Sequence, residues 1–263
     1  MTKKQMKRSD NKETWLAALP VFNEVDYVDD VLDRVVKFAD HVLVVDDGST
    51  DGTAEKLAKR DDVTVIHHDG NQGYGAALKT AFQYTLQNGF DGVVTLDCDG
   101  QHQPKRIPAF IDMARSADIV SGSRYLHHFE GDDAPPEERM FINRRITADL
   151  NRRLGFELTD AFCGFKAYRA EALRQFDITD TGYAMPLQLW VQAAAAGLRV
   201  VEMAVPLIYL DLARSFGGAL DHAQTRLDHY NRVIENEINR LCAEGKHVLH
   251  AVSGDPVCTH QPR

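Results

Sequence analysis

The chain of 263 residues is 44% hydrophobic and 26% charged, which is ordinary for a globular protein with enough material for a large core. Its formal net charge of −9 argues against a nucleic-acid-binding protein, because such proteins usually carry a basic excess that meets phosphates. A disulfide scaffold is not expected either, so reduced thiols in a cytosolic protein are predicted at the four cysteines, Cys98, Cys163, Cys242 and Cys258.

The two ends of the chain predict unstructured segments around one folded domain. Residues 1–13 are basic but precede no apolar segment, which predicts a disordered leader and not a secretory signal. Residues 246–263 predict a flexible tail, which leaves 14–245 as the domain. No stretch of ~18 residues is apolar and uncharged, so we expect a cytoplasmic protein with at most a peripheral membrane contact.

Short apolar runs alternate with helical patterns through the first half of the chain. The patterns predict strands at 15–19, 42–45, 63–66, 92–96 and 118–121, and helices at 25–38, 53–59, 75–88 and 107–115. Strands that alternate with helices of this length indicate βαβ units. The predicted fold class is therefore α/β, with a single, mostly parallel sheet and helices on both faces.

The second half of the chain predicts fewer strands and a long final helix. After a loop at 127–138, the patterns predict a helix at 139–154, a loop, a short strand and a helix start within 158–173, a helix at 186–196, a strand at 198–209 and an amphipathic helix at about 220–241. The last helix is expected to pack on the core, because its polar face mixes acids and bases: Arg226, Asp228, Arg232, Glu235 and Glu237.

Acidic residues follow several of the predicted strands. Asp46 and Asp47 end one apolar run although like charges repel, and Asp97 and Asp99 end another. In a parallel sheet the carboxyl ends of strands border the ligand crevice, so we expect these acids to lie together. Carboxylate and amide oxygens suit Mg²⁺ or Mn²⁺, which predicts a metal site formed by Asp97, Asp99 and Gln101. His102 could add a ligand, although a solvated loop histidine is expected.

Six segments resemble, in the same order, those of family 2 glycosyltransferases. They are LPVFNE (19–24), VVDDGSTDGT (44–53), GNQGYGAAL (70–78), TLDCDGQHQP (95–104), SGSRY (121–125) and TDAFCGFKAYR (159–169). The resemblance covers roughly residues 14–220. It is closest to the polyprenyl-phosphate sugar synthases, such as dolichol-phosphate mannose synthase. It implies the GT-A fold, a nucleotide-sugar donor, Mg²⁺ or Mn²⁺, an inverting hexosyl transfer and a lipid-phosphate acceptor.

The resemblance also implies roles for individual residues. The nucleotide sugar would be bound by Pro20, Phe22, Glu24, Val45, Asp47, Asp97, Cys98, Asp99, Arg124 and Arg214, with Asp46 supporting the turn. The catalytic residues would be Asp99, Arg124 and Asp160. Arg139 and Asn143 would lie near the acceptor phosphate. Their spacing of one helical turn is explained nearly as well by a solvated helix face.

The sequence departs from the family pattern at two places. Gln188 stands where an acid is usual, and an amide cannot accept a proton from an acceptor hydroxyl. A phosphate acceptor is already ionised and needs no such base. In segment 214–220 the usual Ser and Lys are replaced by Ala219 and Leu220, which removes a cation that would bind phosphate. These departures leave the acceptor, and retention of turnover, open.

Other functions remain as alternatives. The segment GYGAAL (73–78) imitates a dinucleotide-binding fingerprint but lacks its third glycine, so an NAD enzyme is not expected. A family 2 transferase that acts on a hydroxyl, or a nucleotide-sugar-binding module without turnover, is compatible with the same motifs. The intact Asp97-x-Asp99-x-Gln101 set favours an enzyme. The donor, GDP-mannose or UDP-glucose, and the oligomeric state stay open.

Overall fold

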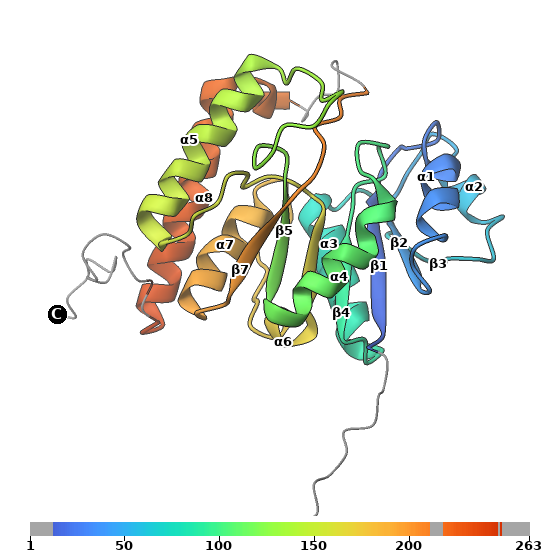
Figure 1. Ribbon diagram of the computed structural model, residues 1–263, viewed down its shortest axis with the longest axis horizontal. Coiled ribbons are helices and arrows are strands. Elements are labelled where there is room, and N and C mark those ends of the chain that lie inside the picture. Colours follow the sequence, from blue (N-terminus) through green and yellow to red (C-terminus); the bar gives the residue numbers. More distant parts are fainter. Residues whose placement is uncertain (1–12, 211–217, 247, 249–263) are drawn as a thin grey trace, which may run out of the picture.

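The computed structural model describes residues 13–210, 218–246 and 248, and places its strands in one seven-stranded sheet (Figure 1). The strands are β1 (Trp15–Val21), β2 (Val42–Asp46), β3 (Thr64–His67), β4 (Gly92–Thr95), β5 (Ile119–Ser123), β6 (Lys166–Arg169) and β7 (Val200–Ala204). Their order is β3-β2-β1-β4-β6-β5-β7. Only β6 pairs antiparallel, so the prediction of an α/β fold with one mostly parallel sheet is confirmed.

Helices follow most of the strands. They are α1 (Val28–Val35), α2 (Thr53–Leu57), α3 (Tyr74–Gln87), α4 (Ile107–Met113), α5 (Glu137–Leu154), α6 (Ala170–Leu173), α7 (Met185–Ala195) and α8 (Ala223–Ala243). The strand predicted at 198–209 is shorter than expected, since β7 ends at Ala204. Pro206 follows, and a proline has no N–H with which to continue the ladder.

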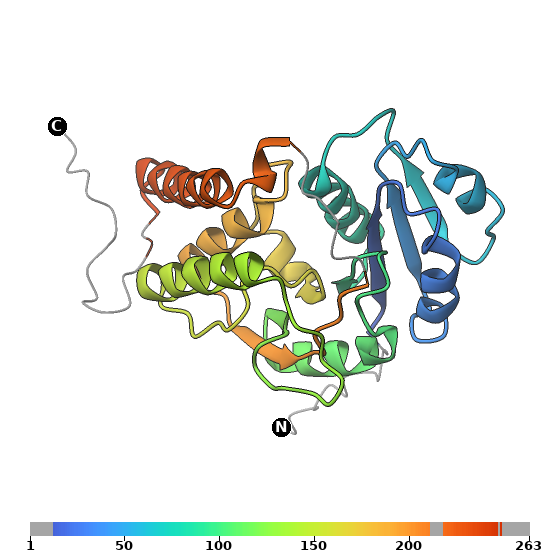
Figure 2. The same ribbon diagram turned by 90° about the horizontal axis from the view of Figure 1, so that it is seen from above.

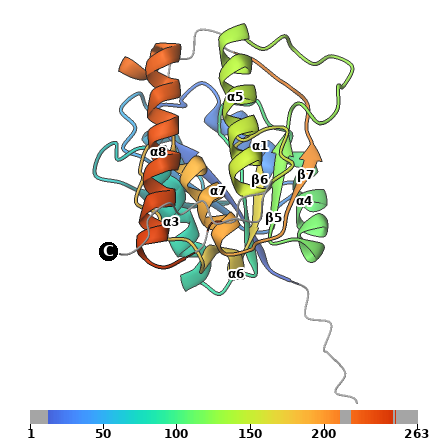
Figure 3. The same ribbon diagram turned by 90° about the vertical axis from the view of Figure 1, so that its left-hand side faces the viewer.

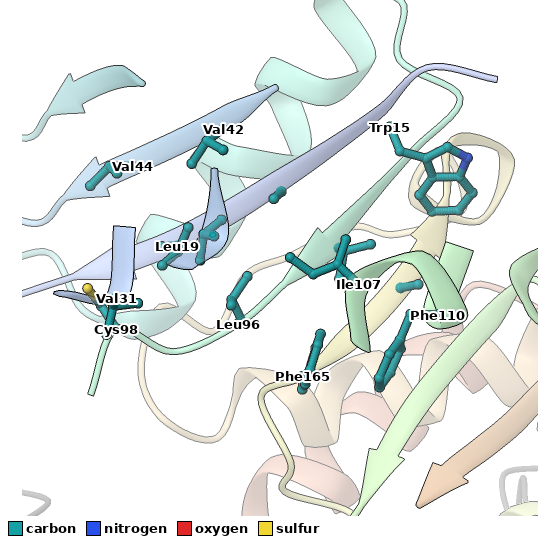
Figure 4. Close-up of a cluster of buried hydrophobic side chains, with 14 of the residues drawn as sticks. Trp15, Leu19, Val31, Val42, Val44, Leu96, Cys98, Ile107, Phe110 and Phe165 are labelled. Carbon is teal, nitrogen blue, oxygen red and sulfur yellow. The ribbon is translucent and has the colours of Figure 1, made fainter. Parts of the chain in front are cut away.

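Side chains of β1 alternate between two cores, as a strand buried on both faces requires. Trp15, Ala17 and Leu19 join a core with α1 and α4, which Figure 4 shows. Leu16 and Ala18 join the opposite core, which contains α3 and α7. The sheet is therefore covered on both faces, and the central strands β1 and β4 are fixed from both sides.

A third core joins α5, α7 and α8. These helices lie beside the sheet, as the views from above and from the side show (Figures 2 and 3). Tyr230, Ile234 and Ile238 of α8 are buried there, so the expectation that this helix packs on the core is confirmed. The expectation that Arg226 and Glu237 belong to the polar face of this helix is wrong, because each is only 3% exposed.

Three expectations drawn from composition have different outcomes. Cys98 and Cys163 are free and buried, but Cys242 is disulfide-bonded, so the prediction of reduced thiols is wrong for that residue. In the described part of the chain no helix has both the length and the apolarity to cross a membrane. The expected leader 1–13 and tail 246–263 lie almost entirely outside the described residues, so they stay predictions.

Candidate active site

The loops that follow β1 and β2 are tied together by side chains. The N–H of Asn23 donates to Ser49 Oγ at 2.9 Å, and Thr50 N–H donates to Asn23 Oδ1 at 2.8 Å. Asn23 has a φ of 56°, a left-handed conformation that asparagine tolerates better than most residues. Glu24 N–H donates to Thr53 Oγ1 at 2.9 Å. The expected nucleoside-binding stretch is therefore held at the carboxyl edge of the sheet, with Phe22 40% exposed at its rim.

Pro20 and Val45 are paired neighbours on β1 and β2 at this edge. Val45 is fully buried, as is the side chain of Cys98 beyond β4, so main-chain atoms are what these two residues can offer a nucleotide. Glu24 is also buried, at 6% exposure. Their roles in nucleotide binding stay predictions.

Asp46 and Asp47 are buried, at 2% and 3% exposure, so water does not surround their carboxylates. Donors from the protein compensate them instead. Asp46 accepts from Ser49 N–H at 3.0 Å and lies 2.9 Å from His67 Nδ1. Asp47 lies 2.6 Å from His68 Nδ1.

Asp47 also organises the loop before α3. Its two oxygens accept from the N–H groups of Gln72 and Gly73 at 2.9 and 2.7 Å. Gly48, with a φ of 75°, packs directly on the same loop, because an added Cβ would come 2.5 Å from the main chain of Gly70. The carboxylate of Asp47 therefore links the end of β2 to the start of α3.

The Asp47→Ala variant is expected to weaken binding of free GDP or UDP even in EDTA. Loss of charge-assisted hydrogen bonds worth ~1.5–3 kcal/mol should free the Gln72–Gly73 loop and cost about one to two decades of affinity. Isothermal titration in EDTA measures this, with Asp69→Ala, an exposed acid just beyond β3, as the matched control. Unchanged affinity would refute the role of Asp47.

Asp97 lies just beyond β4 and contacts three other segments. Tyr74 Oη donates to Asp97 Oδ1 at 3.1 Å, and His102 Nε2 lies 3.1 Å from Asp97 Oδ2. Gly164 leaves room for this carboxylate, since an added Cβ would come 2.3 Å from Asp97 Oδ2. Burial, followed by the charge of Asp97, raises the pKa of Tyr74 well above its usual value, so its hydroxyl stays protonated and donates.

His102 is not the solvated loop histidine that was expected. Its side chain is only 9% exposed, and its ring packs 5.3 Å from that of Phe165. The contact with Asp97 and this packing fix the turn 98–102. Within the same turn, Asp99 Oδ1 accepts from the N–H of Gln101 at 3.0 Å.

The donor set at the end of β4 fits a hard divalent cation in part. Asp97 and Asp99 supply carboxylate oxygens, and Gln101 supplies an amide oxygen, the ligand types that Mg²⁺ and Mn²⁺ prefer. No three His, Cys, Asp or Glu side chains of the described residues converge in a way that could hold a metal ion. Other ligand atoms would therefore have to complete the coordination.

Arg124, beyond β5, forms a two-pronged ion pair with Asp160. Arg124 Nε donates to Asp160 Oδ2 at 2.7 Å and Nη2 donates to Oδ1 at 3.0 Å. Burial opposes ionisation of Asp160, but the charge and hydrogen bonds of Arg124 outweigh it and lower its pKa to about 2. Because Asp160 is completely buried whereas 20% of the Arg124 side chain is exposed, only Arg124 faces outward.

Two further expectations concern residues behind Arg124. Asp160, expected to be catalytic, is completely buried and holds the Arg124 guanidinium in place, and its catalytic role stays a prediction. Asn143 is 4% exposed and donates to Asp160 Oδ1 at 2.7 Å, so the solvated helix face is wrong for this residue, while its place near an acceptor stays a prediction. Arg139 is half-buried, 5.9 Å from the ring of Tyr209, and its role near an acceptor stays a prediction.

Sequence reasoning missed several polar groups around this pair. Glu202 on β7 accepts from Thr159 N–H and Asp160 N–H, at 2.9 and 3.0 Å, and so fixes the loop that carries Asp160. Lys166 on β6 is 3% exposed, donates to the carbonyl of Cys163 and has a pKa that burial lowers. Nothing local in the sequence marks these contacts. Arg214 lies outside the described residues, as does the side chain of Ala219.

The mostly parallel sheet and the acids that end its central strands fit the GT-A glycosyltransferases that the sequence motifs resemble. The model of the family described as glycosyl transferase family 2 matches residues 17–176, and the chain belongs to this family.

Comparisons with known proteins agree with this assignment. The chain is 33% identical over 210 residues to undecaprenyl-phosphate mannosyltransferase of Micrococcus luteus, with 76% of this chain and 86% of that protein covered. It is 32% identical over 209 residues to polyprenol monophosphomannose synthase of Mycolicibacterium smegmatis, with 74% and 77% covered.

Solved structures show the same fold at low identity. Mannosyl-3-phosphoglycerate synthase from Rubrobacter xylanophilus superposes with a TM-score of 0.63 at 19% identity, covering 95% of this chain and 80% of that one. Glucosyl-3-phosphoglycerate synthase from Mycobacterium tuberculosis, crystallised with Mn²⁺, UDP and glucosyl-3-phosphoglycerate, gives a TM-score of 0.63 at 19% identity, covering 86% and 80%. Both confirm the GT-A fold expected from the sequence.

Proposed function

We propose that the protein transfers a mannosyl group from GDP-mannose to a polyprenyl phosphate at the cytoplasmic face of a membrane. The names of the two relatives at 33% and 32% identity support mannose as the transferred sugar and a polyprenyl phosphate as the acceptor. The observation that carries the proposal is the position of the acid pair and the arginine. Asp97 and Arg124 follow β4 and β5, the two strands on either side of β6, so acids suited to a metal and a cation suited to phosphate lie at the same edge of the sheet, where α/β folds bind ligands.

Asp97 and Asp99, with Gln101, are the residues that would hold Mg²⁺ or Mn²⁺, and the solved relative with Mn²⁺ and UDP supports a divalent ion. When bound, such an ion would neutralise charge on the departing nucleoside diphosphate. Asp47 would hold the nucleoside indirectly, because its carboxylate fixes the loop of Gln72 and Gly73. Substitutions of Asp47 and Asp99 test these two assignments separately.

Arg124 is suited to the acceptor phosphate or the donor diphosphate. Burial alone would lower its pKa, but the charge of Asp160 raises it well above the usual value, so the guanidinium stays charged. A phosphate monoester is ionised at neutral pH and can attack without a general base. The amide of Gln188, which cannot serve as a base, is compatible with such an acceptor.

A reconstituted transfer assay tests the proposal. With GDP-mannose, Mn²⁺ and undecaprenyl phosphate in detergent micelles, we expect mannosyl-phosphoryl-undecaprenol, detected by mass spectrometry, and none in EDTA. UDP-glucose is the control donor, and undecaprenol, which lacks the phosphate, is the matched control acceptor. Equal transfer to undecaprenol would overturn the proposal and favour a transferase that acts on hydroxyls.

A further inference from the structure

Gln188, at the position where the family resemblance predicts an acid, belongs to a buried network between α7 and α8. Its Oε1 accepts from the N–H groups of Thr179 and Asp180, at 2.9 and 3.1 Å. Its Nε2 donates to Glu237 Oε2 at 2.8 Å. The amide thus bridges the segment 177–183, which precedes α7, and the C-terminal helix α8. Because Gln188 is 3% exposed, it contacts protein on all sides.

Gln192, one turn further along α7, repeats the bridge. Its Oε1 accepts from Asp177 N–H and its Nε2 donates to Glu237 Oε1, both at 2.8 Å. Glu237 is also 3% exposed and accepts from Arg240 Nη2 at 2.6 Å. Beyond Arg240 lie Asp177 and Glu244, each 2.9 Å from its Nη1. The buried carboxylate of Glu237 therefore accepts hydrogen bonds from two amides and one cation, the compensation that a buried charge requires.

The segment 177–183 packs tightly on the first turn of α3. Ala76 N–H donates to the carbonyl of Thr181 at 3.2 Å, and Lys79 Nζ donates to that of Ile178 at 2.8 Å. No side chain fits between them, because a Cβ on Gly73 would come 2.4 Å from the carbonyl oxygen of Thr181. A displacement of this segment would therefore displace the start of α3.

The start of α3 carries two contacts of the candidate active site. Gly73 N–H donates to Asp47, and Tyr74 Oη donates to Asp97. The ring of Tyr74 also stacks on that of Tyr183, with centroids 5.8 Å apart. A continuous series of contacts thus runs from Glu237 on α8 through Gln188 and the segment 177–183 to Asp47 and Asp97.

We infer that Gln188 and Glu237 are positioning residues, which hold the segment 177–183 against α3 and thereby set the side chains of Asp47 and Asp97. An amide at 188 is then required because a carboxylate faces it from α8. The inference rests on the proposed function only for the rate measurement below.

A reciprocal exchange of amide and acid tests this inference. Gln188→Glu places two carboxylates 2.8 Å apart, and Glu237→Gln sets an amide against the amides of Gln188 and Gln192. The double variant Q188E/E237Q restores one acid and one amide across the contact. The carboxylate that it carries at position 188 can still accept from the two N–H groups, so both single variants should be impaired and the double variant rescued.

Hydrogen exchange of the substrate-free protein is the main measurement. Each single variant should exchange the amides of 72–76 and 179–182 about tenfold faster or more, and the double variant should come within about threefold of wild type. The rate of mannosyl transfer to undecaprenyl phosphate should follow the same order. If wild type shows no transfer, the proposed function fails while the exchange data still decide this inference.

Asn151→Asp is the matched control, because Asn151 on α5 also bridges a loop, through Leu158 N–H and C=O at 2.9 and 2.8 Å. It should leave exchange at 72–76 unchanged. Equal acceleration there in the control would show general destabilisation and overturn the inference. A double variant that exchanges as fast as the single variants would also overturn the inference. If Gln188→Glu does not fold, the double variant can still be compared with Glu237→Gln.

Discussion

Asp99→Asn should reduce mannosyl transfer about a hundred- to a thousandfold while the protein keeps its fold, since a metal contributes several kcal/mol of charge stabilisation and asparagine is a far weaker ligand. Asp99 is only partly buried, and the hydrogen bond that it accepts from the N–H of Gln101 is one that an asparagine oxygen can also accept. The initial transfer rate over a range of Mn²⁺ concentrations measures the loss of activity, and the melting temperature measures whether the fold is kept.

Asp69→Asn is the control for this substitution, because it removes an exposed acid just beyond the edge strand β3. Its transfer rate should match that of wild type. The metal assignment would be wrong if Asp99→Asn kept the wild-type dependence on Mn²⁺. A loss of rate that tracks a lowered melting temperature would instead mark Asp99 as structural.

Most of the sheet could be predicted from sequence because its strands are short apolar runs between helices, the local signature of βαβ units. The exception is β6, whose four residues, Lys166–Arg169, lie between β4 and β5 and run against them. A local pattern predicts that a strand exists, but its direction depends on pairing partners that are distant along the chain. The sequence predicted a short strand within 158–173 and nothing about its direction.

The sequence predicted those parts of the site that depend on acidic and basic residues at strand ends. It did not predict the burial of Asp47. The donors to Asp47 are the main-chain N–H groups of Gln72 and Gly73, and every residue except proline has such a group. The location of His102 depends on the ring of Phe165, which lies on a distant segment. Likewise, Asp160 and Arg124 were both expected to act on substrate, and only tertiary structure shows that one holds the other.

Asp160→Asn should be the most destabilising single change among those considered, at about 3–5 kcal/mol, because it breaks a buried ion pair and leaves the partner charge uncompensated. Asp160 accepts from Arg124, from Asn143 Nδ2 and from Phe162 N–H, at 2.7, 2.7 and 3.0 Å, whereas asparagine would turn an NH₂ group toward one of these donors. Urea unfolding at pH 7 measures the loss. Asp149→Asn, which removes pairs with the 62%-exposed Arg152 and, at 3.5 Å, with Arg153, should cost only about 0–1 kcal/mol.

The contribution of the Asp160 charge should also disappear in acid. Its pKa is about 2 in the folded protein, against an ordinary value of 3.8, so the folded state favours the ionised form. That preference stabilises the fold by roughly 2 kcal/mol above the unfolded pKa, and it is lost as pH falls from about 4 through 2. The difference in unfolding free energy between wild type and Asp160→Asn should therefore be constant above about pH 5 and shrink toward pH 2. A difference that stays constant down to pH 2 would mean that shape and hydrogen bonding, and not charge, hold Arg124 at the edge of the site.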